Sequence, residues 1–479
     1  IRKDIKKGIN AKKITEISSR AIAISQAIKN LKSGDILLVA GKGHENTQEI
    51  GKKKIKFSDR IKILKEINKK NKNLSDQLKI NIIKELSNTQ KLPKSISINN
   101  VSINSNEVRK NDVFFAIKGK KIDGNIFAPE ALKKKSSFVI VNSLNKNYPL
   151  SKQVKVNNSL KFLSKCSTIY RENISAKIIS ITGSCGKTTL KEMIAYALAG
   201  ISKTSYSPKS YNNKYGVPLS IFNLKQNDNF GVVEVGMDKK GEINNLTKII
   251  KPDLGVITNI SYAHSKNFKN IKQIADAKAE IMNNIKKNGH IVLNNDDHFY
   301  SYHKNLAIKK KLNVISFGIK NESSMIKLIK IKKMQNKYEL YIKINGKLFS
   351  FYSTNYNTSN LYNILATLAS IYLYIDIKKL KKNIFLNFKI PDGRGDVSKI
   401  TIQDKKINLI DETYNSNPLS LKSAIENYEK IESKNYKKYL ILGDMLELGK
   451  HSVKQHKLIS KIINKTKINK VYVFGKYIK

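Results

Sequence analysis

The sequence contains no tryptophan and only two cysteines, Cys166 and Cys185, among its 479 residues. Two cysteines cannot build a framework of several disulfides, which excludes a small disulfide-stabilised secreted fold. No apolar run approaches the roughly 20 residues of a membrane-spanning helix, and the N-terminal stretch has no apolar signal-peptide core. We therefore predict a cytoplasmic protein without membrane insertion, and we expect from Ile1, which is not methionine, that the chain is a fragment at its N-terminus.

Acidic residues are scarce, because 90 Lys and Arg face 37 Asp and Glu and the formal net charge is +53. Such a charge suggests nucleic acid or another anionic partner. However, the lysines are spread along the whole chain, whereas a nucleic-acid footprint clusters on one face. No zinc-finger, RRM or KH motif accompanies them. We predict solvated lysines and no nucleic-acid partner, with an ATPase acting on nucleic acid as the rival hypothesis.

The alternation of strand-like and helical segments predicts an α/β protein with about three full domains. From Lys177 to about Asn295, four apolar strands alternate with helices, which is typical of a parallel, doubly wound sheet. Another alternating unit follows Pro391. The N-terminal part contains a predicted helix (19–31), a strand (35–40), the turn "GKGHE" (41–45), a helix (59–69), a polar linker "NKKNKN" (68–73) and a second helix (74–86).

The segment "TGSCGKTT" follows the predicted strand 177–181 and precedes a helix. Backbone N–H groups of Gly183–Thr189 can surround phosphate oxygens, Lys187 can neutralise the β and γ phosphates, and Thr188 can bind Mg²⁺. The first glycine of the usual G-x-x-x-x-G-K pattern falls on Ile181. The alternative is a glycine turn with a surface lysine, but the flanking strand and helix favour a phosphate loop.

Three further polar residues stand where such a site could use them. Glu234 ends an apolar strand and can face the phosphate loop, where its carboxylate can hold the metal from a second side. His264 lies in the loop after the next strand, at the edge where open α/β sheets bind ligands. Lys278 lies on a helix between acidic residues. Taken singly, each of the three has a structural or solvated alternative.

Together these motifs resemble the Mur ligase family of ATP-dependent peptide-bond-forming enzymes. The resemblance covers about residues 74–479 and rests on an ordered set, "TGSCGKTTLKEM", "YNNKYGVPLS", "VEVGMDKKGEI", "TNISYAHSKNF", "AKAEIM", "DETYNSNP" and "LGDMLELG". It implies a three-domain architecture with a central phosphate-loop sheet and a Rossmann-like C-terminal domain. The implied domains are residues 73–176 for the UDP-linked substrate, 177–390 for ATP and 391–479 for the C-terminal ligase part.

The resemblance also implies the reaction and its residues. The implied cofactors are ATP and Mg²⁺, the implied substrates are UDP-N-acetylmuramoyl-tripeptide and D-alanyl-D-alanine in peptidoglycan synthesis, and a monomer is expected. Lys187, Glu234, His264 and Lys278 would be catalytic, with Lys278 a candidate for carbamylation. The implied metal ligands are Thr188, Glu234 and His264. The implied ATP site includes the loop residues Gly183, Ser184, Cys185, Gly186, Lys187, Thr188 and Thr189. It also includes Asn360 and Asn363 at the adenine, Arg394 at the phosphates and Asp411 at the ribose. The implied dipeptide site is lined by Tyr414, Asn415 and Asn417.

The sequence departs from the family pattern in three places. Ser359 replaces the usual histidine before the adenine motif, Asn104–Asn106 replace the usual nucleotide-sugar motif, and Asn125 replaces another histidine. These departures concern mainly the UDP end of the substrate. A tripeptide-forming or folate-polyglutamylating member of the family therefore stays open as an alternative, as does a non-catalytic binding protein, although Lys187, Glu234 and His264 argue against the last.

Both ends of the chain carry a further expectation. Residues 1–72 resemble the C-terminal end of a second Mur ligase, but they lack its phosphate loop and are expected to be an inactive remnant. After Pro391, four strand-like segments end without a covering helix, although parallel sheets are normally covered on both faces. We expect the third domain to be truncated, less stable than the others and limiting for turnover.

Overall fold

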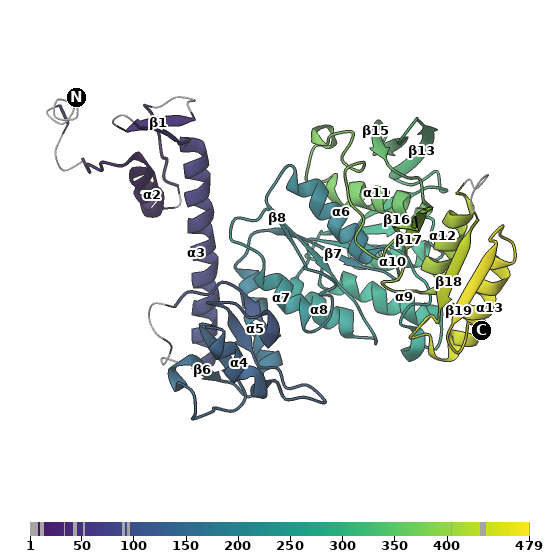
Figure 1. The fold of residues 1–479 in the computed structure, drawn as a ribbon, viewed down its shortest axis with the longest axis horizontal. Coiled ribbons are helices and arrows are strands. Elements are labelled where there is room, and N and C mark those ends of the chain that lie inside the picture. Colours follow the sequence, from purple (N-terminus) through teal and green to yellow (C-terminus); the bar gives the residue numbers. More distant parts are fainter. Residues whose placement is uncertain are drawn as a thin grey trace. The chain divides into compact units, whose positions relative to one another are not determined.

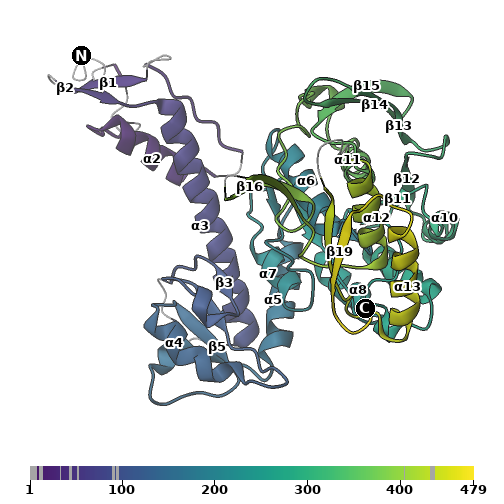
Figure 2. The same ribbon diagram turned by 45° about the vertical axis from the view of Figure 1, so that its right-hand side comes forward.

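The computed structural model describes residues 8–9, 14–32, 34–41, 46–50, 53–88, 92, 96–403, 405–431 and 437–478. The chain divides into two compact units, residues 1–81 and 82–479. Figures 1 and 2 show the elements of both units. The division falls within one long helix, α3 (Asp59–Ser87). None of the helices in the described ranges combines the length and the apolar character needed to cross a membrane.

The N-terminal unit contains the helix α2 (Arg20–Asn30) and a hairpin of β1 (Thr47–Ile50) and β2 (Lys53–Lys56). The helix α2 confirms the prediction, but the strand predicted over residues 35–40 is wrong. Ile36 and Leu38 are 95% and 85% exposed there, and a strand forms only where a neighbour accepts its hydrogen bonds. The predicted "GKGHE" turn lies outside the described residues at positions 42–45.

The predicted polar linker over residues 68–73 is also wrong, because α3 runs through it without a break. The stretch from Asp59 to Ser87 contains neither glycine nor proline, and lysine is a good helix former. An ion pair of 2.9 Å between Lys72 and Asp76, one turn apart, adds to the helix at this point. A polar composition alone does not distinguish a linker from a solvated helix.

The first sheet of the larger unit is small and parallel, with the strand order β3-β4-β5-β6. All residues of the strands β4 and β5 are buried. The bounds are β3 (Val101–Ser102), β4 (Val113–Phe115), β5 (Phe138–Val141), β6 (Gln153–Lys155), α4 (Ala128–Lys133), α5 (Ser159–Glu172) and the 3-10 turns η2 (Ser105–Glu107), η3 (Gly124–Phe127) and η4 (Leu150–Lys152).

A nine-stranded sheet forms the centre of the larger unit, in the order β15-β14-β13-β12-β11-β10-β7-β9-β8. The adjacent strands from β13 through β7 to β8 run parallel, which confirms the parallel sheet predicted for residues 177 to about 295, and an antiparallel hairpin of β14 and β15 extends the sheet at one edge. The bounds are β7 (Lys177–Thr182), β8 (Thr204–Tyr206), β9 (Phe230–Glu234), β10 (Leu254–Ile257), β11 (His290–Asn294), β12 (Asn313–Gly318), β13 (Ile326–Lys333), β14 (Tyr338–Ile344) and β15 (Lys347–Ser353).

Helices cover both faces of this sheet, as Figures 1 and 2 show. On one face α6 (Lys187–Ala199) and α11 (Thr358–Ile371) pack together over the strands, and their apolar residues form the main core. The other face carries α7 (Gly216–Phe222), α8 (Glu242–Ile250) and α9 (Ile271–Ala279). The remaining elements are α10 (Tyr300–Lys309), η5 (Ser265–Asn267), η6 (Glu280–Asn284) and η7 (Ile377–Lys379).

The C-terminal segment has two separate two-stranded sheets, which differs from the single alternating unit expected. The strand β17 pairs antiparallel with β16, while β18 and β19 pair parallel. The tight reversal at Gln403 (φ +45°) favours the local hairpin, because a short loop costs little closure entropy. The bounds are β16 (Asp396–Ile402), β17 (Lys405–Asp411), α12 (Pro418–Glu429), β18 (Tyr439–Gly443), η8 (Gly449–His451), α13 (Ser452–Ile463) and β19 (Lys470–Phe474).

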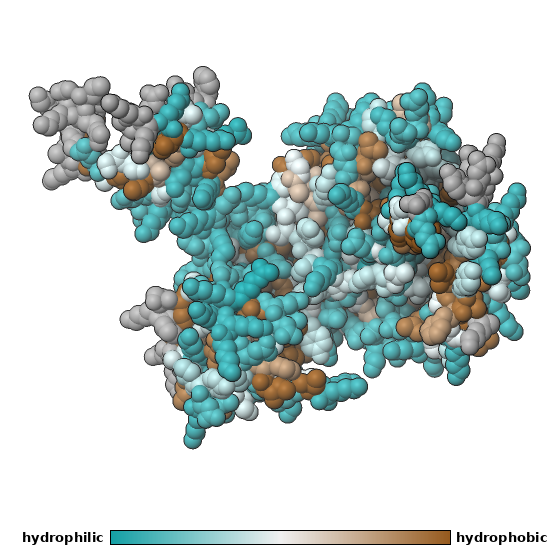
Figure 3. Space-filling model, in the orientation of Figure 1, coloured by the Kyte–Doolittle hydropathy of each residue, from teal (hydrophilic) through white to brown (hydrophobic). Residues whose placement is uncertain are grey.

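Apolar side chains remain exposed on the β18–β19 pair. Ile441 and Phe474 are 80% and 84% exposed, and Figure 3 shows apolar surface around these strands. The small core of this segment lies on the helical side, where Met445 and Leu448 pack with residues of α12 and α13. The expectation of a less stable third domain stays a prediction.

Candidate functional site

The predicted site lies where the strand order of the central sheet reverses. From β7 the chain passes to β8 and β9 on one side, and β10 lies on the other side of β7. The carboxyl ends of β7, β9 and β10 carry the glycine loop, Glu234 and the loop of His264, respectively. A reversal of this kind leaves a crevice at the carboxyl edge, where open α/β sheets bind ligands. The sheet topology therefore gathers segments that are distant in the sequence.

The glycine loop has a backbone that requires glycine at two positions. Gly183 and Gly186 have φ angles of +149° and +79°, and Gly186 is the N-cap of α6. A Cβ atom at Gly183 would collide with the Thr258 hydroxyl, and one at Gly186 would lie 3.1 Å from Asn363 Oδ1. The loop thus lies directly at the start of α6, where unpaired N–H groups and the helix dipole favour an anion.

Ser184 and Cys185 of the glycine loop are held by hydrogen bonds to the segment after β10. The Ser184 hydroxyl donates to the Ser261 carbonyl at 2.9 Å and accepts from its N–H at 2.8 Å. The N–H groups of Ser184 and Cys185 donate to Asn259, at 3.0 and 2.9 Å. Because these two N–H groups are occupied, the groups available to a phosphate are those of the first turn of α6, at residues 186–189.

Two lysine ammonium groups converge on a single carbonyl of this loop. Lys187 Nζ donates to the Gly183 carbonyl at 3.0 Å, and Lys278 Nζ donates to the same oxygen at 2.9 Å. Lys278 is only 2% exposed, so the alternative of a solvated surface lysine does not hold for this residue. Burial lowers the pKa of the Lys278 ammonium well below its ordinary value, and the charge of Lys187 lowers it further. Lys187 therefore brings positive charge to the loop, which suits an anionic ligand.

Glu234 faces the loop, as its place at the end of β9 predicted. The carboxylate is 1% exposed and accepts from Thr188 Oγ1 at 2.7 Å and from Asn212 Nδ2 at 2.7 Å. The structure thus brings together Thr188 and Glu234, two of the three implied metal ligands. Asn212 was not singled out from the sequence, although it lies in the quoted "YNNKYGVPLS" segment.

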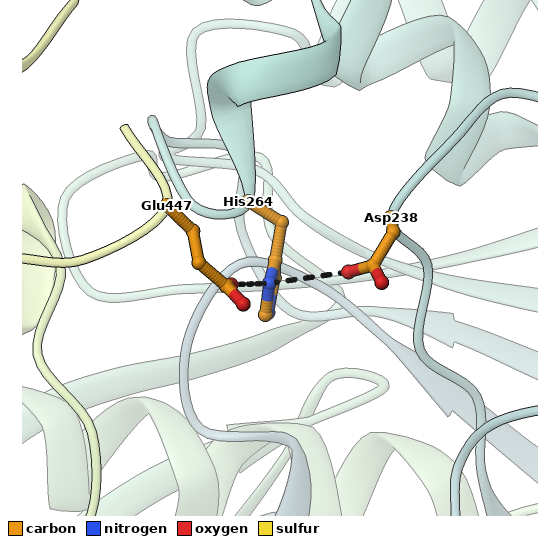
Figure 4. Close-up of side chains that lie close together, drawn as sticks. All are labelled: Asp238, His264 and Glu447. Carbon is orange, nitrogen blue, oxygen red and sulfur yellow. Dashed lines mark ion pairs between the residues drawn. The ribbon is translucent and has the colours of Figure 1, made fainter. Parts of the chain in front are cut away.

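His264, the third implied ligand, contacts two carboxylates instead of Thr188 or Glu234. Its Nδ1 atom contacts the Glu447 carboxylate and lies 3.5 Å from Asp238 Oδ1, as Figure 4 shows. Burial and the charge of Lys187 lower the pKa of the His264 imidazole, and the two carboxylates offset this only in part. The sequence did not single out Asp238 or Glu447, because an acid in a loop is usually just solvated.

The donor set of this region suits a hard divalent cation. A buried carboxylate oxygen and a hydroxyl oxygen meet at Glu234 and Thr188, and Mg²⁺ prefers such oxygen ligands together with phosphate oxygens. The neighbouring cationic loop supplies the place for those phosphates. The donor set of Thr188 and Glu234 therefore fits Mg²⁺, and these are the residues that would hold it.

The implied adenine residues lie on α11, beside the glycine loop. Asn363 is buried and its side chain lies against Gly186, whereas Asn360 Nδ2 donates to Ser353 Oγ at 3.1 Å and is half-buried. The two asparagines stand on one helix near the start of α6, so their positions agree with a shared ligand. Their role at an adenine stays a prediction.

The implied residues of the C-terminal segment reach the central sheet at two points. The Arg394 guanidinium lies over the Tyr414 ring at 4.0 Å, and the Tyr414 hydroxyl pairs with Ser210 Oγ at 2.5 Å. At the other point, Cys185 Sγ donates to Asn417 Oδ1 at 3.1 Å.

Asp411 and Asn415 are not part of these contacts in the described chain. Asp411 accepts from the N–H of Thr413 at 2.9 Å, and Asn415 is exposed. The structure therefore brings Arg394, Tyr414 and Asn417 to the central sheet, whereas Asp411 is half-buried and Asn415 exposed outside these contacts.

Comparisons with known proteins agree with this arrangement. Residues 181–371 match the Mur ligase middle domain, and residues 97–171 match the Mur ligase family catalytic domain. The UDP-N-acetylmuramoyl-tripeptide–D-alanyl-D-alanine ligase of Buchnera aphidicola subsp. Acyrthosiphon pisum is 35% identical over 391 residues, which cover 79% of this chain and 81% of that protein.

Two solved structures share the fold. The crystal structure of MurF from Acinetobacter baumannii has a TM-score of 0.74 and 23% identity, and the match covers 83% of this chain and 85% of that one. The crystal structure of MurF ligase from Thermotoga maritima in complex with ADP has a TM-score of 0.67 and 28% identity, covering 78% and 84%. At 23% identity, the match to the first structure shows a shared fold alone. The second structure was solved with ADP bound.

Proposed function

Because the chain belongs to the Mur ligase family, we propose that it joins D-alanyl-D-alanine to UDP-N-acetylmuramoyl-tripeptide in an ATP-dependent step of peptidoglycan precursor synthesis. The observation that carries this proposal is the cationic loop opposite a buried carboxylate. Lys187 and Lys278 converge on Gly183, and Thr188 bonds to Glu234. This arrangement offers positive charge and a cation site to a polyphosphate in the same crevice.

The reaction that fits these groups proceeds in two steps. The tripeptide carboxylate attacks the γ-phosphorus of ATP, which forms an acyl phosphate and releases ADP. The amine of D-alanyl-D-alanine then attacks the acyl carbon, and inorganic phosphate leaves while the amine loses a proton. Lys187 stabilises the charge that develops on the transferred phosphoryl oxygens. When bound at Thr188 and Glu234, Mg²⁺ supplies further charge neutralisation at these oxygens.

The three implied domains have separate tasks in this reaction. Residues 73–176 bind the UDP end of the substrate, residues 177–390 bind ATP and residues 391–479 contribute to the dipeptide site. The two contacts of Arg394–Tyr414 with Ser210 and of Asn417 with Cys185 support a role for the C-terminal segment at the crevice. Holding two substrates and ATP in register lowers the entropic cost of the reaction.

Lys278 is proposed to be carbamylated in the active enzyme. The neutral amine attacks CO₂ to form a carbamate and releases one proton, and burial favours the required neutral form because it lowers the pKa of Lys278. The product is an anion that offers oxygen atoms to a cation. The Lys187 ammonium, which donates to the same carbonyl, supports the change because it would attract the carbamate anion.

The test of the proposed function is an assay of phosphate release with ATP, Mg²⁺ and UDP-N-acetylmuramoyl-tripeptide, with and without D-alanyl-D-alanine. Release that requires both substrates supports the ligase. Stimulation by DNA in place of the substrates would favour an ATPase acting on nucleic acid. Glutamate addition to a folate, or addition of one amino acid to a muramoyl-dipeptide, would instead favour another reaction of the family.

The remaining proposals concern the context of the enzyme. We place the reaction in the cytoplasm and expect a monomer, in agreement with a site formed within one chain. Residues 1–72 are proposed to take no part in this reaction. Two observations support this proposal. Residues 1–81 form a separate compact unit, and their sequence contains no phosphate-loop motif.

A further inference from the structure

The helix α6 carries a buried lysine that no step of the proposed reaction uses. Lys191 lies one helical turn after Lys187, and its side chain is 0% exposed. Its Nζ atom donates to the Lys209 carbonyl at 2.6 Å and lies 3.5 Å from a carboxylate oxygen of Glu192. A buried charge costs free energy, and an apolar side chain of similar size could fill the same space at a lower cost. Packing alone therefore does not account for an ammonium group at this position.

The carbonyl that accepts this bond lies in a loop with a strained backbone. The loop of residues 207–213 follows β8, and Lys209 within it is left-handed, with a φ angle of +47°, although it is not glycine. Such a conformation costs free energy and persists where the surroundings fix it. A charged donor makes a stronger hydrogen bond than a neutral one. The bond from Lys191 thus holds the 207–213 loop at its strained residue.

Two side chains of the same loop reach the crevice of the proposed site. Ser210, the direct neighbour of Lys209, pairs through its hydroxyl with the Tyr414 hydroxyl at 2.5 Å. Asn212 donates from Nδ2 to the Glu234 carboxylate at 2.7 Å. The loop therefore contacts both the C-terminal segment and the central carboxylate. A displacement of the Lys209 carbonyl would move Ser210 first, because the two residues share a peptide bond.

We propose that Lys191 is a positioning residue, whose ammonium group fixes the 207–213 loop through the Lys209 carbonyl so that Ser210 orients Tyr414 for the incoming dipeptide. This proposal rests on the proposed function, which assigns Tyr414 to the dipeptide site. Neither Lys191 nor Ser210 is among the residues that the family resemblance implied. Lys191 would act through the loop and would not touch the substrates or the cation.

The Glu234 end of the loop has anchors of its own. The Asn212 carbonyl accepts from the Gly236 N–H at 2.7 Å, and a Cβ atom at Gly236 would lie only 2.9 Å from Asn212 Cγ. The Glu234 N–H donates to Ser207 Oγ at 3.2 Å. Asn212 and Ser207 are therefore held by β9 and the residues after it. Loss of the buried ammonium should affect the dipeptide site more than the phosphate site.

The side chain of Lys209 offers a weaker attachment than its carbonyl. Its Nζ atom lies 3.3 Å from a Glu107 carboxylate oxygen, and the two side chains are 73% and 48% exposed. Solvent screens such an exposed ion pair, which contributes little to stability. The bond from the fully buried Lys191 is therefore the contact that decides where Lys209 lies.

The test is the variant Lys191→Met in the full chain, because methionine keeps the apolar stem of lysine but cannot donate a hydrogen bond. Labelling with fluorotyrosine gives ¹⁹F NMR lines for the tyrosines, and the line of Tyr414 is the one that Tyr414→Phe removes. We expect Lys191→Met to shift this line in the absence of ATP and substrates. The physical reason is that the Tyr414 hydroxyl loses its fixed partner, Ser210.

The same variant should separate two Michaelis constants. The KM for D-alanyl-D-alanine should rise about 5- to 10-fold, which corresponds to the loss of one hydrogen bond. The KM for ATP should change by less than about 2-fold, because Asn212 keeps its anchors. A general loss of packing would instead lower kcat through a smaller folded fraction and leave both KM values unchanged.

Lys327→Met is the matched control for the loss of a buried ammonium. Lys327 is 3% exposed, and its Nζ atom donates to the Ile319 carbonyl at 2.9 Å and pairs with Glu322 at 2.7 Å. It therefore makes the same kind of bond to a loop on another part of the central sheet. This variant should leave the Tyr414 line and the KM for the dipeptide unchanged.

Ser210→Ala tests the intermediate step without changing the core. Alone it should shift the Tyr414 line and raise the KM for the dipeptide, and Lys191→Met should add little to it in the double variant, because both changes remove the same contact. The proposal is overturned if either single variant leaves the Tyr414 line unchanged, or if the two effects on KM multiply. Absence of dipeptide-dependent phosphate release in the parent protein would instead refute the proposed function, whereas the NMR line reports the position of Tyr414 without any turnover.

Discussion

The thiol of Cys185 in the glycine loop donates to the side-chain oxygen of Asn417 at 3.1 Å, although the two residues are 232 positions apart. Asn417 is also the N-cap of α12, and it forms a capping box with Ser420. One side chain therefore both begins a helix of the C-terminal segment and contacts the loop of the central sheet. Mutating Asn417 and Cys185 separately can therefore distinguish the contribution of the helix cap from that of the thiol contact.

Asn417→Ala should destabilise the C-terminal segment by about 1 to 2 kcal/mol, because it removes the N-cap together with the thiol contact. Cys185→Ala removes only the contact, and a thiol is a weak donor, so the loss should stay below about 1 kcal/mol. Urea unfolding of both variants measures the difference. Equal losses would show that the cap contributes nothing beyond the contact.

Lys187→Ala should reduce the turnover number by about 10²- to 10³-fold, because it removes a charged group from the developing phosphoryl charge. The thermal unfolding midpoint should change little, since within the described part of the chain the ammonium donates a hydrogen bond to the Gly183 carbonyl alone. Lys248→Ala, at an exposed position of α8, is the control and should keep full activity. Near-normal turnover in Lys187→Ala would contradict the assignment of the phosphate loop.

Lys278→Ala tests the proposed carbamate. Removal of the side chain should abolish dipeptide-dependent turnover, and added formate or another small carboxylate should restore part of it by occupying the vacated space. Mass spectrometry of the parent protein under native conditions should show the added mass of CO₂. An alanine variant as active as the parent would contradict a role for this lysine.

The buried ammonium of Lys278 should also make stability depend on pH in CO₂-free buffer. Its pKa is lowered in the folded state by burial, so the unfolded chain binds a proton that the folded chain lacks. Between the lowered pKa and the ordinary value near 10.4, stability must therefore rise with pH, by at most about 1.4 kcal/mol per pH unit. Lys278→Met should remove this rise in urea unfolding at pH 7, 8 and 9, and unchanged slopes would contradict it.

Deletion of residues 1–72 should leave dipeptide-dependent phosphate release by the remaining chain unchanged. The removed part belongs to the separate N-terminal unit, although the cut falls within α3 and keeps residues 73–81 of that unit. Steady-state assays of both chains at equal concentration provide the comparison. A large loss of activity would show that the N-terminal unit contributes to the site.

The amino-acid sequence by itself determined the parts of this protein that depend on neighbouring residues. The strand before Gly183, the glycines and the helix after Lys187 form a contiguous pattern, and local backbone preferences are enough to predict the loop. The alternation of apolar strands and helices likewise predicted the parallel sheet. Glu234 could be placed correctly because it ends a strand next to that loop.

Only the tertiary structure decided which distant groups meet. The pairing of His264 with Glu447, the burial of Lys278 and the contact of Asn212 with Glu234 arise from the way the sheet brings loops together. The same reason explains the errors over residues 35–40 and 68–73. A segment forms a strand only when another strand pairs with it, and a segment is a linker only when it does not pack against the rest of the protein. Neither condition can be read from the neighbouring residues in the sequence. Hydrogen bonding and burial between remote segments, which no local pattern encodes, decided these features.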